Sequence, residues 1–356
     1  MAKPETYQYS PLLTKNSIRL LLLQPGAPGS DIHCSLIHST LRDMHDDIYQ
    51  HYIALSYVWG DASKTRTVFV DHTPFQATVN LAAALEDLRH PQMVLRLWAD
   101  AICINQSNIL ERNHQVGLMR DIYSLAQHTV IHLGERKEEC DEVLNAALRG
   151  TLNSPHRQLA IDQVLSRPWF TRVWIYQELV LSKDPWVQCG RTRIRWDALY
   201  AAICPGEDPQ SSGFDGDSDG DPEGDLIKGS GDNEPIHSDA VVDERGLIQL
   251  FSGMHKARKG QPETPTLFEV MLSRRGFGVS DPRDLVYGHL AVARLPSKNN
   301  IPACPVVDYQ RSIAEVFTEA TAYILKRTDY NETLHLSDVR TPSRRLKGLP
   351  SWVPDW

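Results

Sequence analysis

A carboxylate stands among large apolar residues in the stretch 167–182 of this chain, which reads RPWFTRVWIYQELVLS. In one continuous helix, Trp174 and Glu178 lie one turn apart on the same stripe, and Phe170 and Leu181 make that stripe apolar. Moving a carboxylate toward apolar surface costs desolvation energy unless it is paired, and such groups are enriched at functional sites. Glu178 is therefore the candidate functional carboxylate. The alternative is a Glu at the border of the helix that pairs with a basic neighbour.

A carboxylate beside aromatic surface has a definite chemistry. It can stabilise an oxocarbenium-like transition state, in which a sugar carbon gains positive charge as the bond to the leaving group breaks. A leaving group that departs as a neutral molecule needs no second carboxylic acid to protonate it. Trp59 or Trp174 could stack on a base or on a cationic ring, although each could equally be a large residue in or near the core.

Two further polar residues have a chemical and a structural interpretation. Asp100 could orient a ribose hydroxyl, or it could cap the loop that follows its strand. Arg112 could meet a phosphate, or it could be an exposed helical Arg that pairs with Asp or Glu. Composition and spacing leave both alternatives open.

Three apolar runs predict the strands that position these residues, namely 52–57, 94–100 and 129–133. Helical patterns separate them, and alternating strands and helices predict an α/β fold with a parallel sheet wrapped by helices on both sides. In such sheets ligands bind beyond the carboxyl ends of the strands. The segments 56–61, 100–106 and 134–135 are therefore candidate walls of a binding site.

Other segments are expected to flank this sheet. Residues 17–24 and 32–37 predict an N-terminal edge hairpin around a turn rich in Pro and Gly, and 68–70 and 75–77 predict a small second hairpin. The expected organisation is a first domain at 1–206, an acidic disordered insertion at 207–244 and a C-terminal helical region at 245–356 packed on the first domain. The insertion holds thirteen acidic residues and one Lys, with few large apolar residues to bury.

Composition narrows the class of protein. The net charge of −8 across 356 residues resides in the insertion, so the remainder is mildly basic, which suits anionic small molecules. Runs of Lys and Arg with interleaved aromatics are absent, so we expect no nucleic-acid partner. The first apolar run is too short for a signal core or membrane span, which predicts a cytoplasmic protein. Six Cys without a CxxC pair and His residues without metal-ligand spacing predict no metal site.

Three sequence blocks together resemble the heterokaryon incompatibility (HET) domain of filamentous fungi. They are YIALSYVWGD at 52–61, LWADAICINQ with the ER and Q that follow it at 97–115, and RPWFTRVWIYQELVLS at 167–182. Later stretches at 280–293, 306–317 and 349–356 look like segments that commonly follow this domain. The acidic insertion departs from the family pattern. GxGxxG, GxxxxGK[ST], HExxH and GxSxG are absent, so other common enzyme signatures are lacking.

The resemblance implies a role in fungal non-self recognition and regulated cell death, with a TIR-like, flavodoxin-like sheet. TIR enzymes cleave NAD and carry a Trp and, four residues later, a Glu on the helix after the third strand; Trp174 and Glu178 have this spacing. The chain is therefore expected to be an NAD nucleosidase with NAD as substrate and no cofactor. Its expected partners, besides NAD, are further copies of itself on activation and an upstream sensor protein.

The resulting site prediction has Glu178 as the catalytic residue. The residues expected to bind substrate are Ser56, Tyr57, Trp59, Gly60, Asp61, Asp100, Asn105, Arg112 and Trp174. The alternative function is a non-catalytic signalling module, in which the same surfaces mediate self-association and cell death follows from the partners recruited.

Overall fold

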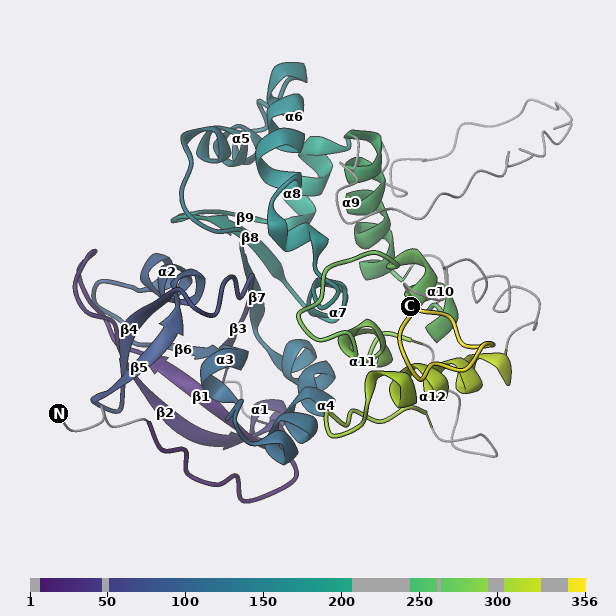
Figure 1. The fold of residues 1–356 in the computed structure, drawn as a ribbon. Coiled ribbons are helices and arrows are strands. Elements are labelled where there is room, and N and C mark those ends of the chain that lie inside the picture. Colours follow the sequence, from purple (N-terminus) through teal and green to yellow (C-terminus); the bar gives the residue numbers. More distant parts are fainter. Residues whose placement is uncertain (1–6, 47–50, 207–243, 261–263, 294–303, 328–344) are drawn as a thin grey trace, which may run out of the picture.

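The computed structural model describes residues 7–46, 51–206, 244–260, 264–293, 304–327 and 345–356 (Figure 1). The predicted insertion at 207–244 lies outside these residues, apart from Glu244, which begins a helix. The boundaries predicted for the three regions therefore stay predictions.

One mixed sheet organises the described chain. Its strands are β1 (Ser17–Leu23), β2 (His33–Thr40), β3 (Ile53–Tyr57), β4 (Thr65–Val70), β5 (Thr73–Thr78), β6 (Leu95–Trp98), β7 (His128–His132), β8 (Pro185–Cys189) and β9 (Thr192–Arg195). They are arranged in the order β5-β4-β2-β1-β6-β3-β7-β8-β9. The strands β6, β3, β7 and β8 form a parallel centre, which confirms the α/β class and the three predicted strands.

The hairpins lie elsewhere than expected. Strands β1 and β2 pair antiparallel as predicted, but β1 also pairs with β6 and β2 with β4, so the predicted edge position is wrong. Strands β4 and β5 form the second hairpin, with β5 at one edge of the sheet and β9 at the other. The burial pattern explains the interior position, because nearly every residue of β1 is buried, as expected for a strand covered on both faces.

Helices fill the connections between the strands and the region after them. The first set is α1 (Leu41–Asp46), α2 (Val79–Leu88), α3 (Asp100–Cys103), α4 (Ile109–Leu125), α5 (Glu138–Leu148), α6 (Ser154–Ala160), α7 (Ile175–Val180) and α8 (Trp196–Ile203). The second set is α9 (Glu244–Arg258), α10 (Leu267–Ser273), α11 (Asp284–Leu290) and α12 (Ile313–Leu325). A π-helical turn, Ile161–Leu165, and a 3-10 turn, Pro168–Thr171, precede α7.

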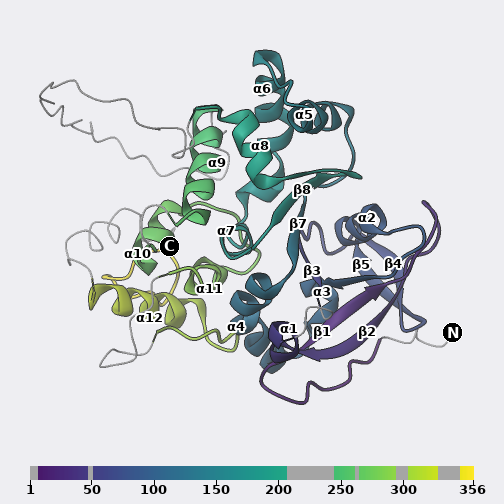
Figure 2. The ribbon, with the colours of Figure 1, turned by 180° about the vertical axis from the view of Figure 1, so that it is seen from behind.

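Three clusters of buried side chains hold these elements together. Neighbouring residues of β7 point to opposite faces of the sheet, and Val130 joins the first cluster whereas Ile131 joins the second. Helix α9 contributes Phe251 to the second cluster, against Trp196. The third cluster is formed by α10, α11, α12 and the last described residues, and Trp174 packs against it. Figures 1 and 2 show these three helices grouped beside α4 and α7.

Candidate functional site

Glu178 lies in α7 with 3% of its surface exposed, next to the carboxyl end of β3. The Ser56 hydroxyl, in β3, donates a hydrogen bond to Glu178 Oε2. The Ser56 oxygen in turn accepts a hydrogen bond from Trp169 Nε1 at 2.7 Å. This chain of donors fixes one carboxylate oxygen, so Glu178 has a defined orientation rather than a mobile surface position.

The helix that carries Glu178 is shorter than the sequence pattern predicts. The stretch 167–182 is not one helix, because the 3-10 turn Pro168–Thr171 is followed by an extended residue, Arg172, before α7 begins. Phe170 consequently faces the second cluster, where it packs against Trp196 and Phe251. Trp174 and Glu178 do remain one turn apart, and the Glu178 amide donates to the Trp174 carbonyl at 3.2 Å.

Asp100 stands beside this carboxylate because β3 and β6 are parallel neighbours, whose carboxyl ends meet at one edge of the sheet. It is the first residue of α3, and its Oδ1 accepts the Ala101 amide at 2.8 Å. Its Oδ2 accepts the indole N–H of Trp59 at 2.8 Å. Asp100 therefore begins α3 and anchors Trp59, which fits its predicted structural role, while its predicted contact with a ribose hydroxyl stays a prediction.

Gly60 sets the path of the loop that carries Trp59. Its φ is +75°, in the left-handed region that favours glycine, and a Cβ there would lie 2.6 Å from Asn80 Nδ2. Asn80 in turn donates to the carbonyl of Val58 at 3.0 Å. The turn after β3 is thus tied to α2, and a side chain at position 60 would disturb it.

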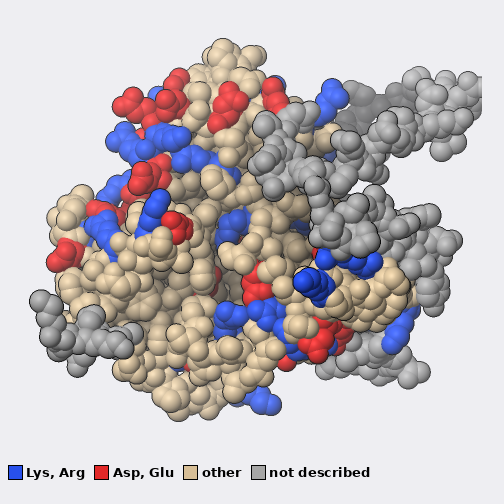
Figure 3. Space-filling view, in the orientation of Figure 1, with Lys and Arg blue, Asp and Glu red and all other residues tan. Residues whose placement is uncertain are grey.

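These residues surround a cavity of about 480 Å³, a volume in the range of small-molecule sites. The predicted residues that line it are Trp59, Gly60, Asp100, Arg112, Trp174 and Glu178. The space-filling view shows the face of Figure 1 hollowed near its middle, with acidic and basic side chains at the border (Figure 3). Six predicted residues are therefore brought together on one cavity.

Four other predicted residues do not line this cavity. Ser56 and Tyr57 are 1% and 2% exposed and lie behind its wall, where Ser56 supports Glu178. Asp61 is exposed and accepts hydrogen bonds from the Ser63 amide and hydroxyl. Asn105 lines a separate hollow of about 500 Å³. Asp61 and Asn105 each adjoin a cavity residue in the sequence. They do not line the cavity, because the chain turns away from the sheet edge at both positions.

Arg172 lines this cavity as well, although the sequence did not indicate it. Its guanidinium donates to the carbonyl of Tyr57 and lies near both Glu178 and Asp100. Burial raises the pKa of Glu178 to about 7; Arg172 and the Ser56 hydrogen bond oppose this rise, whereas Asp100 adds to it. Burial likewise raises the pKa of Asp100, and Arg172 lowers it. One cation is thus shared by two carboxylates.

The opposite wall comes from the C-terminal region. Asp281, Asp284 and Tyr309 line it, and none of them was assigned to the site from the sequence. The guanidinium carbon of Arg112 lies 3.7 Å from the centre of the Tyr309 ring, and Arg112 Nη2 is 3.9 Å from Asp281 Oδ2. The Tyr309 hydroxyl donates to Asp284 Oδ1 at 2.6 Å. Burial raises the pKa of Asp284 to about 6, against the effects of hydrogen bonds from Tyr309 and Trp174.

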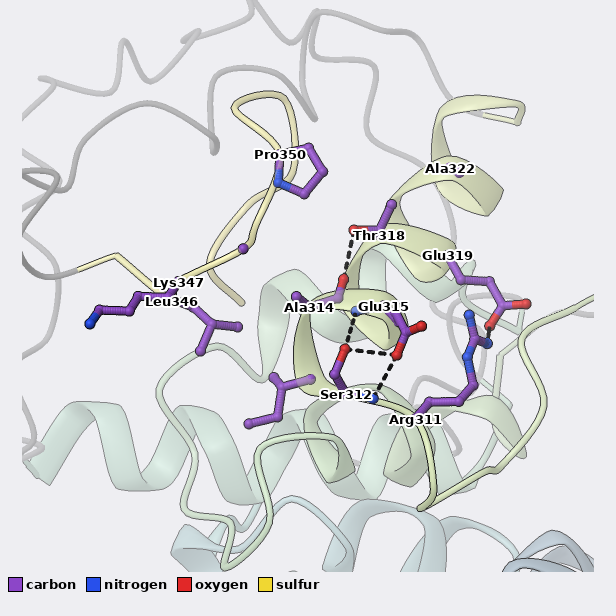
Figure 4. Close-up of a pocket in the computed structure, with 12 residues that line it drawn as sticks. Arg311, Ser312, Ala314, Glu315, Thr318, Glu319, Ala322, Leu346, Lys347 and Pro350 are labelled. Atoms are coloured by element: carbon purple, nitrogen blue, oxygen red, sulfur yellow. Dashed lines mark hydrogen bonds and ion pairs between the residues drawn. The ribbon is translucent and has the colours of Figure 1, made fainter.

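Another hollow, beside α12, offers fewer side chains for chemistry than the cavity around Glu178 (Figure 4). Its Ser312 and Glu315 cap the helix by exchanging hydrogen bonds with each other's backbone, and Arg311 pairs with Glu319. Figure 4 shows Lys347 directed away from these groups. The polar side chains are therefore engaged in holding α12, and the cavity around Glu178 is the better candidate site.

Among the described residues, no group of three or more His, Cys, Asp or Glu side chains is arranged to hold a metal ion. Within the same part of the chain, no helix has the length and apolar character needed to cross a membrane.

Comparison with known proteins gives two matches. Residues 52–178 match the family model described as heterokaryon incompatibility protein (HET). The chain is also 26% identical, over 413 aligned residues, to heterokaryon incompatibility protein 6, OR allele, of Neurospora crassa. That alignment covers 95% of this chain and 57% of the relative, so the chain spans a little over half of the relative's length. No solved structure matches. Both findings support the resemblance to the HET domain, and the matched segment ends at Glu178.

Proposed function

We propose that this chain acts in fungal heterokaryon incompatibility as a HET-domain cell-death effector, and that its cavity hydrolyses NAD at the nicotinamide–ribose bond. The first part rests on the HET match and on the name of the Neurospora crassa relative. The second part rests above all on the position of Glu178, a carboxylate oriented by Ser56 in the wall of a cavity that also holds aromatic and cationic side chains.

The topology supports a TIR-like plan for the parallel centre. Along the chain β3 comes first, β6 adds on one side of it, and β7 and then β8 add on the other. Flavodoxin-like sheets begin with the same order, and bind ligands beyond the carboxyl ends of their strands. Helix α7, which carries Glu178 and begins just after Trp174, lies between β7, the third parallel strand of this series, and β8, although α5 and α6 precede it in that connection.

The cavity has a group suited to each part of NAD. The indoles of Trp59 and Trp174 offer flat surfaces for a base or for the cationic nicotinamide ring. The guanidinium groups of Arg112 and Arg172 offer charge to the diphosphate. The carboxylates of Asp100 and Glu178 can accept hydrogen bonds from ribose hydroxyls. These assignments use only residues that line one cavity.

The proposed reaction breaks the bond between the ribose C1′ and the nicotinamide nitrogen. The bonding electron pair leaves with nicotinamide, which departs as a neutral molecule, and the positive charge passes to the ribose as an oxocarbenium-like centre. The Glu178 carboxylate stabilises this charge, and water then adds to C1′ and releases one proton to solvent. The products are ADP-ribose, nicotinamide and a proton, so a second carboxylic acid is unnecessary.

The protonation state of Glu178 fits a cationic substrate. With a pKa of about 7, the free carboxyl group is about half ionised at neutral pH. A bound nicotinamide cation would favour the ionised form, because an opposite charge nearby lowers the pKa of a carboxyl group. Substrate binding would therefore generate the carboxylate that the transition state needs.

The decisive experiment compares nicotinamide release from NAD by the purified parent and by Glu178→Gln. The substitution keeps the shape and most hydrogen bonding but removes the negative charge, so the rate is expected to fall by a factor on the order of 100 or more. Glu142→Gln is the matched control, because Glu142 is 59% exposed in α5 and does not line the cavity. This control should release nicotinamide at the parent rate.

A folded Glu178→Gln protein that cleaves NAD at the parent rate would remove Glu178 from the mechanism. A parent protein that releases no nicotinamide would refute the NAD part of the proposal and leave the non-catalytic signalling module as the function of the HET domain.

A further inference from the structure

Arg274 is buried, and no carboxylate of the described residues pairs with it. It follows α10, and 3% of its surface is exposed. Its Nε and Nη1 have no hydrogen-bond partner among the residues that the structure describes. Its guanidinium carbon lies 3.7 Å from the centre of the Phe277 ring and 5.4 Å from that of Tyr176. Burying a charge without a counter-ion is costly, so this Arg requires an explanation beyond packing.

Within the part of the chain that the structure describes, the one hydrogen bond of the Arg274 side chain reaches the candidate site. Arg274 Nη2 donates to the backbone carbonyl of Arg172 at 2.9 Å. Arg172 is the extended residue between the 3-10 turn and α7, so its carbonyl lies outside both helical hydrogen-bond ladders. Arg274 supplies the missing donor, and in doing so contacts the residue whose side chain lies between Glu178 and Asp100.

Residues that follow Arg274 in the sequence also hold the backbone around Arg172. Arg172 forms a parallel bridge with Gly278, in which the Gly278 amide donates to Thr171 and the Val173 amide donates to Gly278. These bonds measure 2.6 and 3.2 Å. On the cavity side, the Arg172 guanidinium donates to the carbonyl of Tyr57. The residue is therefore fixed at its backbone by the C-terminal region and at its tip by the sheet.

We infer that Arg274 is a positioning residue for the proposed reaction, which holds the Arg172 guanidinium between Glu178 and Asp100 through the Arg172 carbonyl. The inference rests on the proposed function for its catalytic meaning. An Arg suits this place better than a Lys, because guanidinium is more weakly hydrated than ammonium and stacks on aromatic faces. His289, which packs nearby, stays neutral because burial lowers its pKa to about 3, so it neither replaces nor cancels this charge.

The groups that face Glu178 determine what loss of Arg274 should do. They are Ser56 and Tyr57 from β3, Asp100 from α3, Tyr123 from α4, and Arg172. Burial keeps both tyrosines neutral well above pH 10. Arg172 is the only cation among these groups that lowers the pKa of Glu178, so displacing its guanidinium should make Glu178 titrate at higher pH.

The test titrates Glu178 directly in the full chain. Protein labelled with ¹³C at the glutamate carboxyl carbon is followed by NMR, and the Glu178 signal is assigned by its loss in Glu178→Gln. Arg274→Met removes the donors and keeps much of the volume, and the Glu178 midpoint is expected to rise by about one pH unit. Arg274→Lys retains a donor of similar reach but is less suited to this aromatic site, so it should raise the midpoint less than Arg274→Met does. Arg275→Met, at the neighbouring position outside the cavity lining, is the matched control and should not shift it.

Activity supplies a second readout. A rise from about 7 to about 8 lowers the ionised fraction of Glu178 at pH 7 about fivefold, so NAD cleavage by Arg274→Met should fall about fivefold at pH 7 and recover near pH 9. A merely structural defect would lower the rate at both pH values. If the parent does not cleave NAD but the Glu178 midpoint still rises in Arg274→Met, the proposed function is refuted and the positioning of Arg172 is upheld.

An unchanged Glu178 midpoint in folded Arg274→Met would overturn the inference. Should that variant lose its cooperative melting transition, Arg274→Gln replaces it, because a Gln side chain is too short to span to the Arg172 carbonyl. The same rise is then expected, and an unchanged midpoint in folded Arg274→Gln would overturn the inference equally.

Discussion

Glu178 makes the protein less stable as the pH rises. Its pKa is about 7 in the folded chain, above the ordinary value of 4.5 that the unfolded chain restores. The folded state consequently binds more protons than the unfolded state between these two values. The stabilising effect of the protonated group is complete below about pH 4.5 and is lost as the pH rises through 7.

Replacing this group by a neutral one of the same shape should therefore stabilise the fold at alkaline pH. The raised pKa of Glu178 lowers the free energy of unfolding by about 3 kcal/mol at pH 8 and by less than about 1 kcal/mol at pH 5. We expect Glu178→Gln to melt at a higher temperature than the parent at pH 8, with a gap that narrows at pH 5. Thermal melts of both proteins at the two pH values measure this. A gap that is equal at both pH values would mean that Glu178 titrates normally.

Arg172 shows why part of the site could not be found from the sequence. In a continuous helix, residues 172 and 178 would point about 120° apart, so the pattern that selects Glu178 excludes Arg172. The turn of the chain at Arg172 is produced by its bridge to Gly278, a contact that periodicity cannot reveal. Glu178, Trp174 and Asp100 were predictable because each lies at the end of a strand or on a short helix with a clear local pattern.

The contact between α11 and the segment before α7 is unusually close. Gly288 lies inside α11, and a Cβ at this position would be 2.7 Å from Val173 Cγ1 and 3.6 Å from the Trp174 ring. Glycine is a poor helix former, so its use here is explained by the approach of the two segments.

Two helical glycines allow this closeness to be tested. Gly288→Ala should lower the free energy of unfolding by about 1 to 3 kcal/mol, because the added methyl group has no room. Gly117→Ala is the matched control: Gly117 lies in α4 with no atom within 4 Å of an added Cβ, and Ala there should stabilise by about 0.5 to 1 kcal/mol. Urea unfolding of the two variants gives both values. Equal effects of the two substitutions would show that α11 does not press on Val173.

At the scale of elements, three of the four parallel strands were predictable, namely β3, β6 and β7, whereas β8 and β9 were not. β3 and β7 are apolar runs with clear ends, which is sufficient for a buried parallel strand. β8 and β9 were missed because Pro185–Cys189 and Thr192–Arg195 are short and mix apolar with polar residues. The interior place of β1 was missed because pairing between β1 and β6 joins segments far apart in the chain.

Across the whole molecule, residues outside the matched segment 52–178 support the site from both sides. On the C-terminal side Arg274 contacts Arg172. On the N-terminal side Arg19 in β1 forms a buried ion pair with Glu111 in α4 at 2.5 Å. The same Glu111 oxygen accepts the Asn105 amide at 2.8 Å, between the cavity residues Ile104 and Gln106. The hairpin is therefore part of the architecture that shapes the cavity.

Breaking the Arg19 pair should be costly because it leaves a charge without its partner. Arg19→Met is expected to lower the free energy of unfolding by about 3 to 5 kcal/mol, and Arg19→Met with Glu111→Gln by clearly less. The control is Arg66→Met, which breaks a pair of the same 2.5 Å length to Glu86 with 41% and 23% of the side chains exposed. It should cost at most about 1 kcal/mol. Denaturant melts of the parent and the three variants measure the free energies of unfolding. Similar losses of this free energy in Arg19→Met and Arg66→Met would contradict the expectation.

The bridge between Arg172 and Gly278 joins residues about a hundred positions apart, and the Tyr309 wall is further still from Glu178. During synthesis, the ribosome adds about 5 to 20 residues per second, so the strands around Glu178 emerge several seconds or more before the wall that faces them. A nascent or prematurely terminated chain thus presents Glu178 without the enclosing cavity.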